Sequence, residues 1–444
     1  MPIDHVRDRA VSALLRILEQ GAHSDVVINR ILRKGTLSAR GGRFLTHLVY
    51  GVVRHKLLCD YVLSDVCNQP LDKMPPAVLM VLRMGVFQAF FCDNVTRPAL
   101  VHTSVDIARK RGNVGLAKLT NAVLRRVPKS LEEASLPSRD ADFDNYLRVR
   151  YSMPRWMVRL WRDRYGDAGA EAFCVACASP APTTIRVNRR RTDKETLLEQ
   201  LRAAGFAAAP VDDCRDGLLV SDEGGLLKSK LFQSGHFMLQ NPASMLAAEM
   251  TTPRPGENVL DMCAAPGGKA SHLAVLTGDT GRVTALELYR GRLERVRENC
   301  TRLDIANVQP VCGDGLAPPF KAGSFDVVLL DAPCSGLGTL RRHPEIKWRT
   351  TPELPAQLAR TQQALLRKAT QLCKNGGLIV YSVCTLTREE TLEIVSEAIS
   401  EGTCVPEDGP EHYNRWKTAQ GQYQTDPRVA AWDGFFLTRF RKRS

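Results

Sequence analysis

The sequence predicts an all-α domain over residues 1–128 and a doubly wound α/β domain over residues 240–444. Two observations lead to this prediction. Apolar residues recur every three or four positions in the first part, and short apolar runs alternate with helical patterns in the last part. A chain of 444 residues also exceeds one ordinary hydrophobic core, so more than one domain is expected.

The first predicted domain is helical and basic. Residues such as Val11, Leu14 and Leu18 follow helical spacing, and glycines and prolines divide residues 6–126 into five to seven helices. Residues 1–130 contain 20 Lys and Arg against 9 Asp and Glu, whereas the remainder contains 41 against 39. This asymmetry favours contact with an anionic polymer, most simply nucleic acid. The alternative is a solvated basic face.

Composition excludes several classes of protein. With 44% hydrophobic and 25% charged residues, the chain has a globular composition. Its most apolar window, residues 77–92, is too short to cross a bilayer and contains Arg83, and the N-terminus lacks the apolar core of a signal peptide. The 13 cysteines are scattered, which is typical of reduced thiols and predicts a cytoplasmic protein without membrane contact. Cys174 and Cys177 form a C-x-x-C with no second ligand pair, so packing on a helix face is favoured over zinc or redox chemistry, and no metal is expected.

A linker and a small RNA-binding subdomain are predicted for residues 129–239. Residues 128–144 have the polar composition of a linker, a helix is expected to enter through Pro154, and residues 184–188 read as a short strand. A basic run lies on and just after that strand, at Arg186, Arg189, Arg190 and Arg191. Such runs are usually solvated, but the position before the α/β domain favours phosphate contact.

The last domain alternates strands with helices. Predicted strands cover residues 258–261, 282–286, 308–312, 325–330, 377–382 and 435–440. Predicted helices include residues 269–276, 290–303 and 352–373. This order is typical of a doubly wound parallel sheet, with the final strand expected to be antiparallel.

The first of these strands runs into a glycine-containing turn, residues 261–269, which precedes a helix. The turn lacks the G-x-G-x-x-G of dinucleotide-binding folds and the G-x-x-x-x-G-K-[ST] of phosphate-binding loops. A cofactor with a nucleoside but no pyrophosphate remains, and S-adenosylmethionine is the natural candidate.

Three acids end three consecutive predicted strands: Asp261, Glu287 and Asp314. Glu287 is placed to accept hydrogen bonds from both ribose hydroxyls, and Asp314 to accept one from the adenine amine. Taken singly, Glu287 could be a surface residue at a helix start and Asp314 part of an Asp-Gly turn.

Two thiols are expected at the same sheet edge. The buried strand over residues 325–330 leads to Asp331 and Cys334, and the strand over residues 377–382 leads to Cys384. If these strands are neighbours, about 4.8 Å apart, both thiols face one crevice. Two thiols and a carboxylate beside a methyl donor suggest covalent catalysis on a pyrimidine. The alternatives are a disulfide or a metal site lacking its other ligands.

Several strings carry a family resemblance: APGGK at 265–269, DAPCSG at 331–336, RHPEIKW at 342–348 and YSVCT at 381–385, followed by Glu389 and Glu390. With them the chain resembles the RNA 5-methylcytosine methyltransferases, above all the RsmB (Sun) family, which acts on 16S ribosomal RNA of the small subunit. LVYG at 48–51 and NAVLRR at 121–126 are similar to the NusB-like N-terminal domain of that family, and DGFF at 433–436 fits as well.

The resemblance implies a class I, Rossmann-like methyltransferase domain with named site residues. S-Adenosyl-L-methionine would be bound by Cys263, Ala264, Ala265, Pro266, Gly267, Gly268, Lys269, Glu287, Asp314 and Asp331. Cys384 would be the nucleophile that attacks carbon 6 of a cytosine exposed from its stack. Asp331 would steady the ring at nitrogen 3, Cys334 would assist release, and Lys269 would help position Asp331 and the substrate.

Two other functions remain open from the sequence. Transfer RNA could be the substrate of the same chemistry. The chain could also be a non-enzymatic RNA-binding or antitermination-like protein, in which the sheet domain is a relic.

Overall fold

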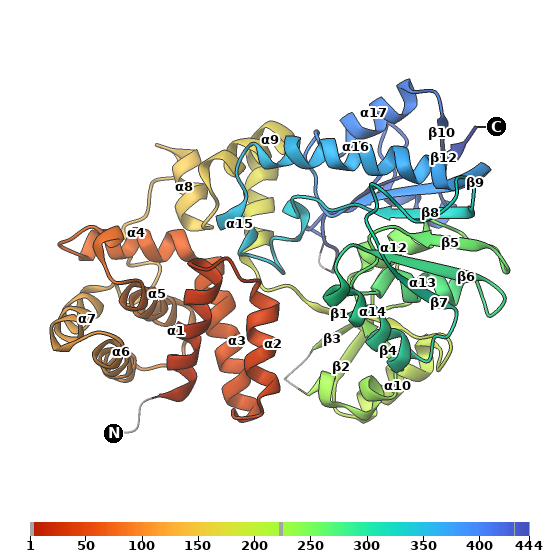
Figure 1. The fold of residues 1–444 in the computed structure, drawn as a ribbon. Helices are drawn as coiled ribbons and strands as arrows, with labels where there is room; N and C mark the ends of the chain where they lie inside the picture. Colours follow the sequence, from red (N-terminus) through yellow and green to blue (C-terminus); the bar gives the residue numbers. More distant parts are fainter. Residues whose placement is uncertain (1–3, 222–224, 430, 444) are drawn as a thin grey trace. The chain divides into compact units, whose positions relative to one another are not determined.

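Two compact units make up the computed structural model, which describes residues 4–221, 225–429 and 431–443 (Figure 1). The first unit comprises Met1–Pro180 together with Leu340–Thr350, and the second comprises Ala181–Thr339 and Thr351–Ser444. The first unit is therefore discontinuous in sequence. None of the described helices is both long and apolar enough to span a membrane.

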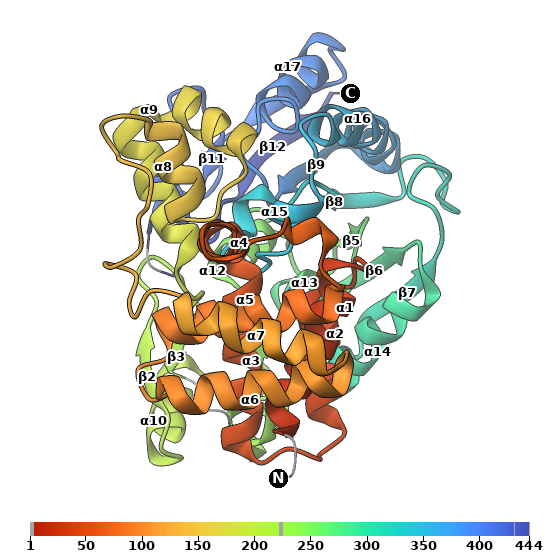
Figure 2. The ribbon, with the colours of Figure 1, turned by 90° about the vertical axis from the view of Figure 1, so that its left-hand side faces the viewer.

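Seven α-helices occupy the described residues of the first predicted domain, which confirms the predicted helical domain. They are α1 (His5–Leu18), α2 (Ser24–Arg33), α3 (Ala39–Arg54), α4 (Lys56–Val66), α5 (Pro76–Phe91), α6 (Arg97–Arg111) and α7 (Val114–Arg126), with a 3-10 turn at Leu71–Lys73. Figure 2 shows α6 and α7 lying side by side.

Helix α5 is the centre of this bundle. Its residues 78–88 are all buried, as expected for a helix that is apolar on every side. Gly51 of α3 lets the two helices approach closely, because a Cβ atom there would lie 2.0 Å from the Phe87 ring. The unpatterned apolar run in this part of the sequence is thus explained by a buried helix rather than a membrane span.

Two more helices and the inserted segment complete the first unit. Helices α8 (Phe143–Arg150) and α9 (Arg155–Ala178) follow the polar stretch, and α9 begins directly after Pro154, as predicted. Cys174 and Cys177 are buried on α9, which confirms helix-face packing. The segment Leu340–Thr350 contains the short helix α15 (Ile346–Arg349).

The inserted segment is held by hydrogen bonds to the helical bundle. Trp348 Nε1 donates to the Val53 carbonyl at 2.8 Å, and Lys347 Nζ donates to the Arg54 carbonyl at 2.8 Å. Glu345 accepts from the backbone N–H of Ser24 at 3.0 Å. These contacts bury Glu345 and Lys347 within the first unit.

The second unit contains an eight-stranded sheet in the order β10-β12-β9-β8-β5-β6-β7, with β11 paired to β12. Its strands are β5 (Asn258–Asp261), β6 (Arg282–Glu287), β7 (Val308–Cys312), β8 (Phe325–Asp331), β9 (Cys373–Val383), β10 (Cys404–Glu407), β11 (Tyr423–Gln424) and β12 (Phe436–Lys442). Strands β5 to β9 are parallel and β12 is antiparallel, which confirms the predicted doubly wound fold.

Helices cover both faces of the sheet. Val327 and Leu329 of β8 pack in one core and Val328 and Leu330 pack in another, so successive side chains enter opposite layers. The helices are α12 (Pro242–Glu249), α13 (Gly268–Leu276), α14 (Arg290–Leu303), α16 (Leu354–Leu372) and α17 (Leu392–Ser400). The chain switches direction between β5 and β8, where ligands bind in open α/β sheets.

A second, four-stranded antiparallel sheet precedes the large one, in the order β2-β3-β1-β4. It consists of β1 (Thr183–Val187), β2 (Ala207–Pro210), β3 (Gly217–Ser221) and β4 (Phe237–Leu239), with α10 (Lys194–Ala203) and α11 (Lys230–Gln233). Only β1 was expected from the sequence. Strands β2 and β4 are too short to show a clear alternation of apolar and polar residues.

Candidate active site

A cavity of about 160 Å³ opens at the carboxyl ends of β5 and β8. The predicted site residues that line it are Cys263, Ala264, Ala265, Pro266, Gly268, Lys269 and Asp331. Asp261, Gln240 and Ser244 contribute to the same wall. The structure thus brings together the glycine-containing turn and the end of the strand that carries Asp331.

Gly267 gives the turn its shape. Its φ of 97° lies in the left-handed region, and a Cβ atom there would lie 3.0 Å from Val296 Cα on α14. The Gly267 N–H donates to the Ala264 carbonyl at 2.7 Å, and the next residue begins α13. The turn therefore folds tightly enough for its backbone to form a cavity wall.

Asp261 is a buried carboxylate without a partner. It is 1% exposed, and no side chain of the described residues donates a hydrogen bond to its carboxylate. Burial raises the pKa of Asp261 to about 7, partly offset by the charge of Lys269. An uncompensated buried anion is costly, so this end of the cavity suits a ligand with a positive charge.

Lys269 and Asp331 form an ion pair in the wall of the same cavity. Lys269 Nζ lies 2.7 Å from Asp331 Oδ2, and Ser382 Oγ donates to Asp331 Oδ1 at 2.9 Å. Burial alone would lower the pKa of Lys269, but the adjacent Asp331 carboxylate raises it overall. The Asp331 side chain is therefore held by a charged donor on one oxygen and a neutral donor on the other.

The predicted pairing of the two thiol-bearing strands is confirmed. Strands β8 and β9 are parallel neighbours, with Asp331 opposite Ser382. The Sγ atoms of Cys334 and Cys384 lie 3.1 Å apart, and both cysteines are free. The hydrogen bond with Cys384, together with burial, raises the pKa of Cys334 well above its ordinary value. Cys334 therefore stays protonated beside Cys384.

Family models match three parts of the chain. Residues 248–441 match the model of the 16S rRNA methyltransferase RsmB/F, residues 4–129 match the NusB family, and residues 153–225 match the ferredoxin-like domain of the RsmF/B-like methyltransferases. A probable ribosomal RNA small subunit methyltransferase B from Bacillus subtilis (strain 168) is 34% identical over 99% of both chains. The chain belongs to the ribosomal RNA small subunit methyltransferase B family.

Other relatives agree with this family. The ribosomal RNA small subunit methyltransferase B of Thermus thermophilus is 33% identical and covers 98% of this chain and 97% of its own. The crystal structure of PH0851 superposes with a TM-score of 0.85 over the whole of both chains, at 24% identity, which shows a shared fold. A methyltransferase homolog from Pyrococcus horikoshii superposes with a TM-score of 0.58 at 26% identity, covering 68% of this chain and 99% of that one.

Glu390 is a buried carboxylate for which no role was predicted from the sequence. Glu390 is fully buried and accepts hydrogen bonds from the Ser335 N–H at 2.8 Å, from Thr387 Oγ1 at 2.9 Å and from Gln362 Nε2 at 3.0 Å. The Tyr381 hydroxyl donates to the Glu390 carbonyl at 2.8 Å. Glu390 thus joins the loop after Cys334 to the loop after Cys384. The only sequence signal was its place shortly after the YSVCT string.

The two remaining predicted acids lie at strand ends but not in the cavity wall. Glu287 ends β6 and is 3% exposed; its carboxylate accepts from the Tyr289 N–H at 3.1 Å and from the Ala265 N–H at 3.4 Å. Asp314 is exposed, and its side chain accepts from the Leu316 N–H at 2.9 Å. Glu287 therefore touches the glycine-containing turn, whereas Asp314 stabilises a turn of its own.

The prediction for Arg186 was wrong. We expected it in a solvated or phosphate-binding basic run, but it is 1% exposed and points into the second unit. The other members of the run, Arg189, Arg190 and Arg191, are exposed and form ion pairs with Asp216, Asp279 and Asp304. Arg186 differs because it lies within β1, where alternate side chains point toward the large sheet's helices rather than the solvent.

Proposed function

We propose that the protein transfers a methyl group from S-adenosyl-L-methionine to carbon 5 of a cytosine in 16S ribosomal RNA. The reaction proceeds through a covalent bond between Cys384 and carbon 6. The observation that carries this proposal is the pair of thiols, 3.1 Å apart, beside the Lys269–Asp331 ion pair. Membership of the family supports small-subunit ribosomal RNA as the substrate.

The cavity fits the methyl donor. The buried, unpartnered carboxylate of Asp261 is complementary to the ammonium group at the methionine end. The donor would be held by Cys263 to Lys269 and Asp331, by Glu287 at the ribose, and at the adenine by Asp314, which lies outside the cavity wall and accepts from the Leu316 N–H. When bound, S-adenosylmethionine supplies an electrophilic methyl group on a positively charged sulfur.

The protein's own residues prepare the cytosine. The Cys384 thiolate adds to carbon 6, and the electrons of the ring double bond make carbon 5 nucleophilic while Asp331 steadies the ring at nitrogen 3. Carbon 5 takes the methyl group, and a base then removes the carbon 5 proton. The electrons of that C–H bond restore the double bond and expel the Cys384 sulfur. Cys334, which stays protonated, donates a hydrogen bond to the departing sulfur and so assists release.

The remaining regions present the RNA. Residues 1–128 act as a NusB-like RNA-binding domain, residues 129–239 as a linker and small RNA-binding subdomain, and residues 240–444 as the catalytic domain. Within these bounds, residues 129–180 and Leu340–Thr350 belong to the first compact unit. The excess of Lys and Arg in the first 130 residues supports an electrostatic role for the helical domain.

Paired cysteine variants test the chemistry. Cys384→Ala is expected to abolish methyl transfer to 16S ribosomal RNA, whereas Cys334→Ala is expected to accumulate a protein–RNA adduct that survives denaturing electrophoresis. Cys312→Ala, at an exposed thiol, serves as the control. Normal turnover by the Cys384→Ala protein would contradict the covalent mechanism.

The substrate is tested separately. Bisulfite sequencing of ribosomal and transfer RNA from a strain that lacks the protein should show one cytosine in 16S ribosomal RNA that has lost its methyl group. Loss of a methyl group in transfer RNA alone would instead support the second substrate class. Calorimetry with S-adenosylmethionine distinguishes both from a relic domain, which would release no heat.

A further inference from the structure

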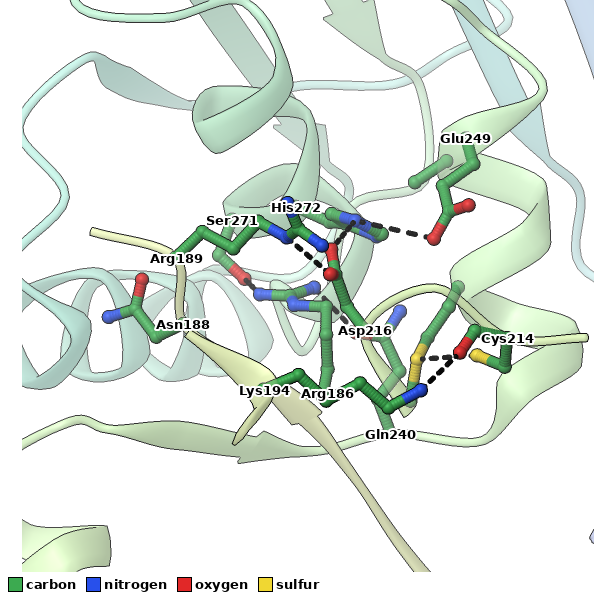
Figure 3. Close-up of polar contacts among 12 residues, drawn as sticks. Arg186, Asn188, Arg189, Lys194, Cys214, Asp216, Gln240, Glu249, Ser271 and His272 are labelled. Carbon is green, nitrogen blue, oxygen red and sulfur yellow. Dashed lines mark hydrogen bonds and ion pairs between the residues drawn. The ribbon is translucent and has the colours of Figure 1, made fainter. Parts of the chain in front are cut away.

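Arg186 makes three hydrogen bonds in the interior of the second unit. Its Nη1 donates to Gln240 Oε1 and to the Gly268 carbonyl, each at 2.5 Å, and its Nη2 donates to Ser271 Oγ at 2.9 Å (Figure 3). Burial lowers the pKa of Arg186 to about 10, so the guanidinium is still charged at neutral pH. The guanidinium of Arg186, on β1 of the small sheet, therefore contacts the first turn of α13.

The acceptors of this arginine are unusual for a buried charge. None of the three is a carboxylate, although desolvation of a guanidinium costs several kcal/mol without a charged partner. Asp216 and Glu249 act on Arg186 only through space. The guanidinium fork therefore holds three neutral groups in one arrangement, which a lysine ammonium could not do in the same geometry.

Two of these acceptors belong to the wall of the cavity. Gln240 and Gly268 both line it, whereas Arg186 does not. Gln240 also donates from Nε2 to Ser244 Oγ at 3.2 Å, and Ser244 lines the cavity too. Fixing Gln240 Oε1 therefore fixes a chain of polar groups that faces the ligand.

The hydrogen bond from Arg186 to the Gly268 carbonyl also connects Arg186 to the Lys269–Asp331 ion pair. The Gly268 carbonyl belongs to the peptide group that joins Gly268 to Lys269. It accepts from Arg186 Nη1 and also from Ser271 Oγ at 3.0 Å, so Arg186 helps to hold that peptide in place. The Lys269 side chain extends from the α-carbon next to this peptide, and its Nζ lies 2.7 Å from Asp331 Oδ2. A change in the peptide plane would move the ammonium group away from Asp331.

We propose that Arg186 is a positioning residue of the methyltransferase site, acting through Gln240 and the Gly268–Lys269 peptide on both cofactor binding and the Lys269–Asp331 pair. This inference rests on the proposed function. The small sheet would then have two functions: contact with RNA, and positioning of the cofactor site through the hydrogen bonds that Arg186 of β1 donates to Gln240 and Gly268.

Calorimetry on the full-length protein tests this role with S-adenosylmethionine as the probe. Arg186→Gln is expected to weaken binding at least tenfold, about 1.4 kcal/mol, and to lower kcat as well. Asn188→Ala is the matched control: Asn188 is also buried next to β1, and its Nδ2 donates to the Gly235 and Leu303 carbonyls at 2.8 Å, away from the cavity. It should lower the Tm but leave the Kd unchanged.

Two milder variants keep the test decisive if Arg186→Gln does not fold. Arg186→Lys and Ser271→Ala should each weaken binding, and their effects should be less than additive because they share one hydrogen bond. Where Arg186→Gln folds, added guanidinium ion should partly restore binding at concentrations that leave the Tm of that variant unchanged.

The outcomes separate the two proposals. If wild-type protein binds S-adenosylmethionine and the Arg186 variants bind it equally well, the positioning role is wrong and the proposed function stands. If the Asn188→Ala control loses as much affinity as Arg186→Gln, general destabilisation explains the result and the inference is overturned. If wild-type protein shows no binding, the proposed function itself fails.

Discussion

The hydroxyl oxygens of Ser335 and Thr385 lie 2.8 Å apart, and each residue directly follows one of the two thiols of the site. The Ser335 hydroxyl also donates to Glu390, whose carboxylate accepts from the Ser335 N–H as well. All three residues are buried. Polar contacts between the residues that follow the two cysteines therefore help to hold the two sulfurs 3.1 Å apart.

Glu390→Gln should lower kcat while leaving cofactor affinity intact. The amide can accept only through one oxygen, so a buried donor loses its partner, at a cost of about 1–3 kcal/mol. We expect kcat to fall roughly tenfold or more in single-turnover assays. Glu389→Gln is the matched control, since Glu389 is only partly buried. Equal losses in both variants would contradict a role for Glu390 in holding the loops.

Lys269→Met should disable the site more severely. It leaves the Asp331 carboxylate without its charged partner, and we expect kcat to fall by at least about 100-fold, about 2.7 kcal/mol. Lys374→Met provides the comparison, because Lys374 pairs with Asp326 at the other end of β8, at 2.5 Å. Activity should survive in that variant. A near-normal rate for Lys269→Met would rule out the positioning of Asp331 by this lysine.

The affinity for S-adenosylmethionine should rise with pH through about 7. Asp261 has a pKa of about 7 when the cavity holds no cation, so its anionic form gains population as the pH increases past that value. A positively charged ligand binds that form more tightly. Asp261→Asn should bind weakly and show no such rise. Calorimetric titrations on both sides of pH 7 measure the effect, and identical pH profiles for the two proteins would refute it.

The free energy of unfolding should decrease as the pH rises, because of the buried carboxyl group of Glu249. Burial, and then the charge of Asp216, raise the pKa of Glu249 from 4.5 to about 8. The folded state therefore binds more protons than the unfolded state between these values, so the contribution of Glu249 to stability is lost as the pH rises toward 8. Glu249→Gln should remove this loss, at most about 1.4 kcal/mol per pH unit. Thermal unfolding near pH 6 and near pH 8 compares the two proteins, and a variant with the wild-type slope would count against this assignment.

The elements that the sequence predicted best are those whose pattern is local. The strands of the large sheet are short apolar runs between polar turns, so their carboxyl ends at Asp261, Asp331 and Val383 could be placed within a residue or two. The proximity of Cys334 to Cys384 followed from strand order, because parallel neighbours bring their carboxyl ends together.

The features that escaped prediction depend on contacts between distant residues. Arg186 reads as part of a basic run, and only the fold reveals that β1 turns it toward Gly268. Glu390 reads as an ordinary acid after a motif, and its burial depends on Tyr381 and Gln362 arriving from other elements. Local periodicity carries no information about either.

The segment Leu340–Thr350 has a consequence for the order in which the chain can fold during synthesis. Helices α1 to α9 of the first unit leave the ribosome long before Trp348 and Lys347, yet these side chains donate to the carbonyls of Val53 and Arg54. The bundle therefore lacks these two side-chain donors until more than half of the second unit has been made. A nascent chain that stops at Pro180 would carry every helix from α1 to α9 and still be an unfinished domain.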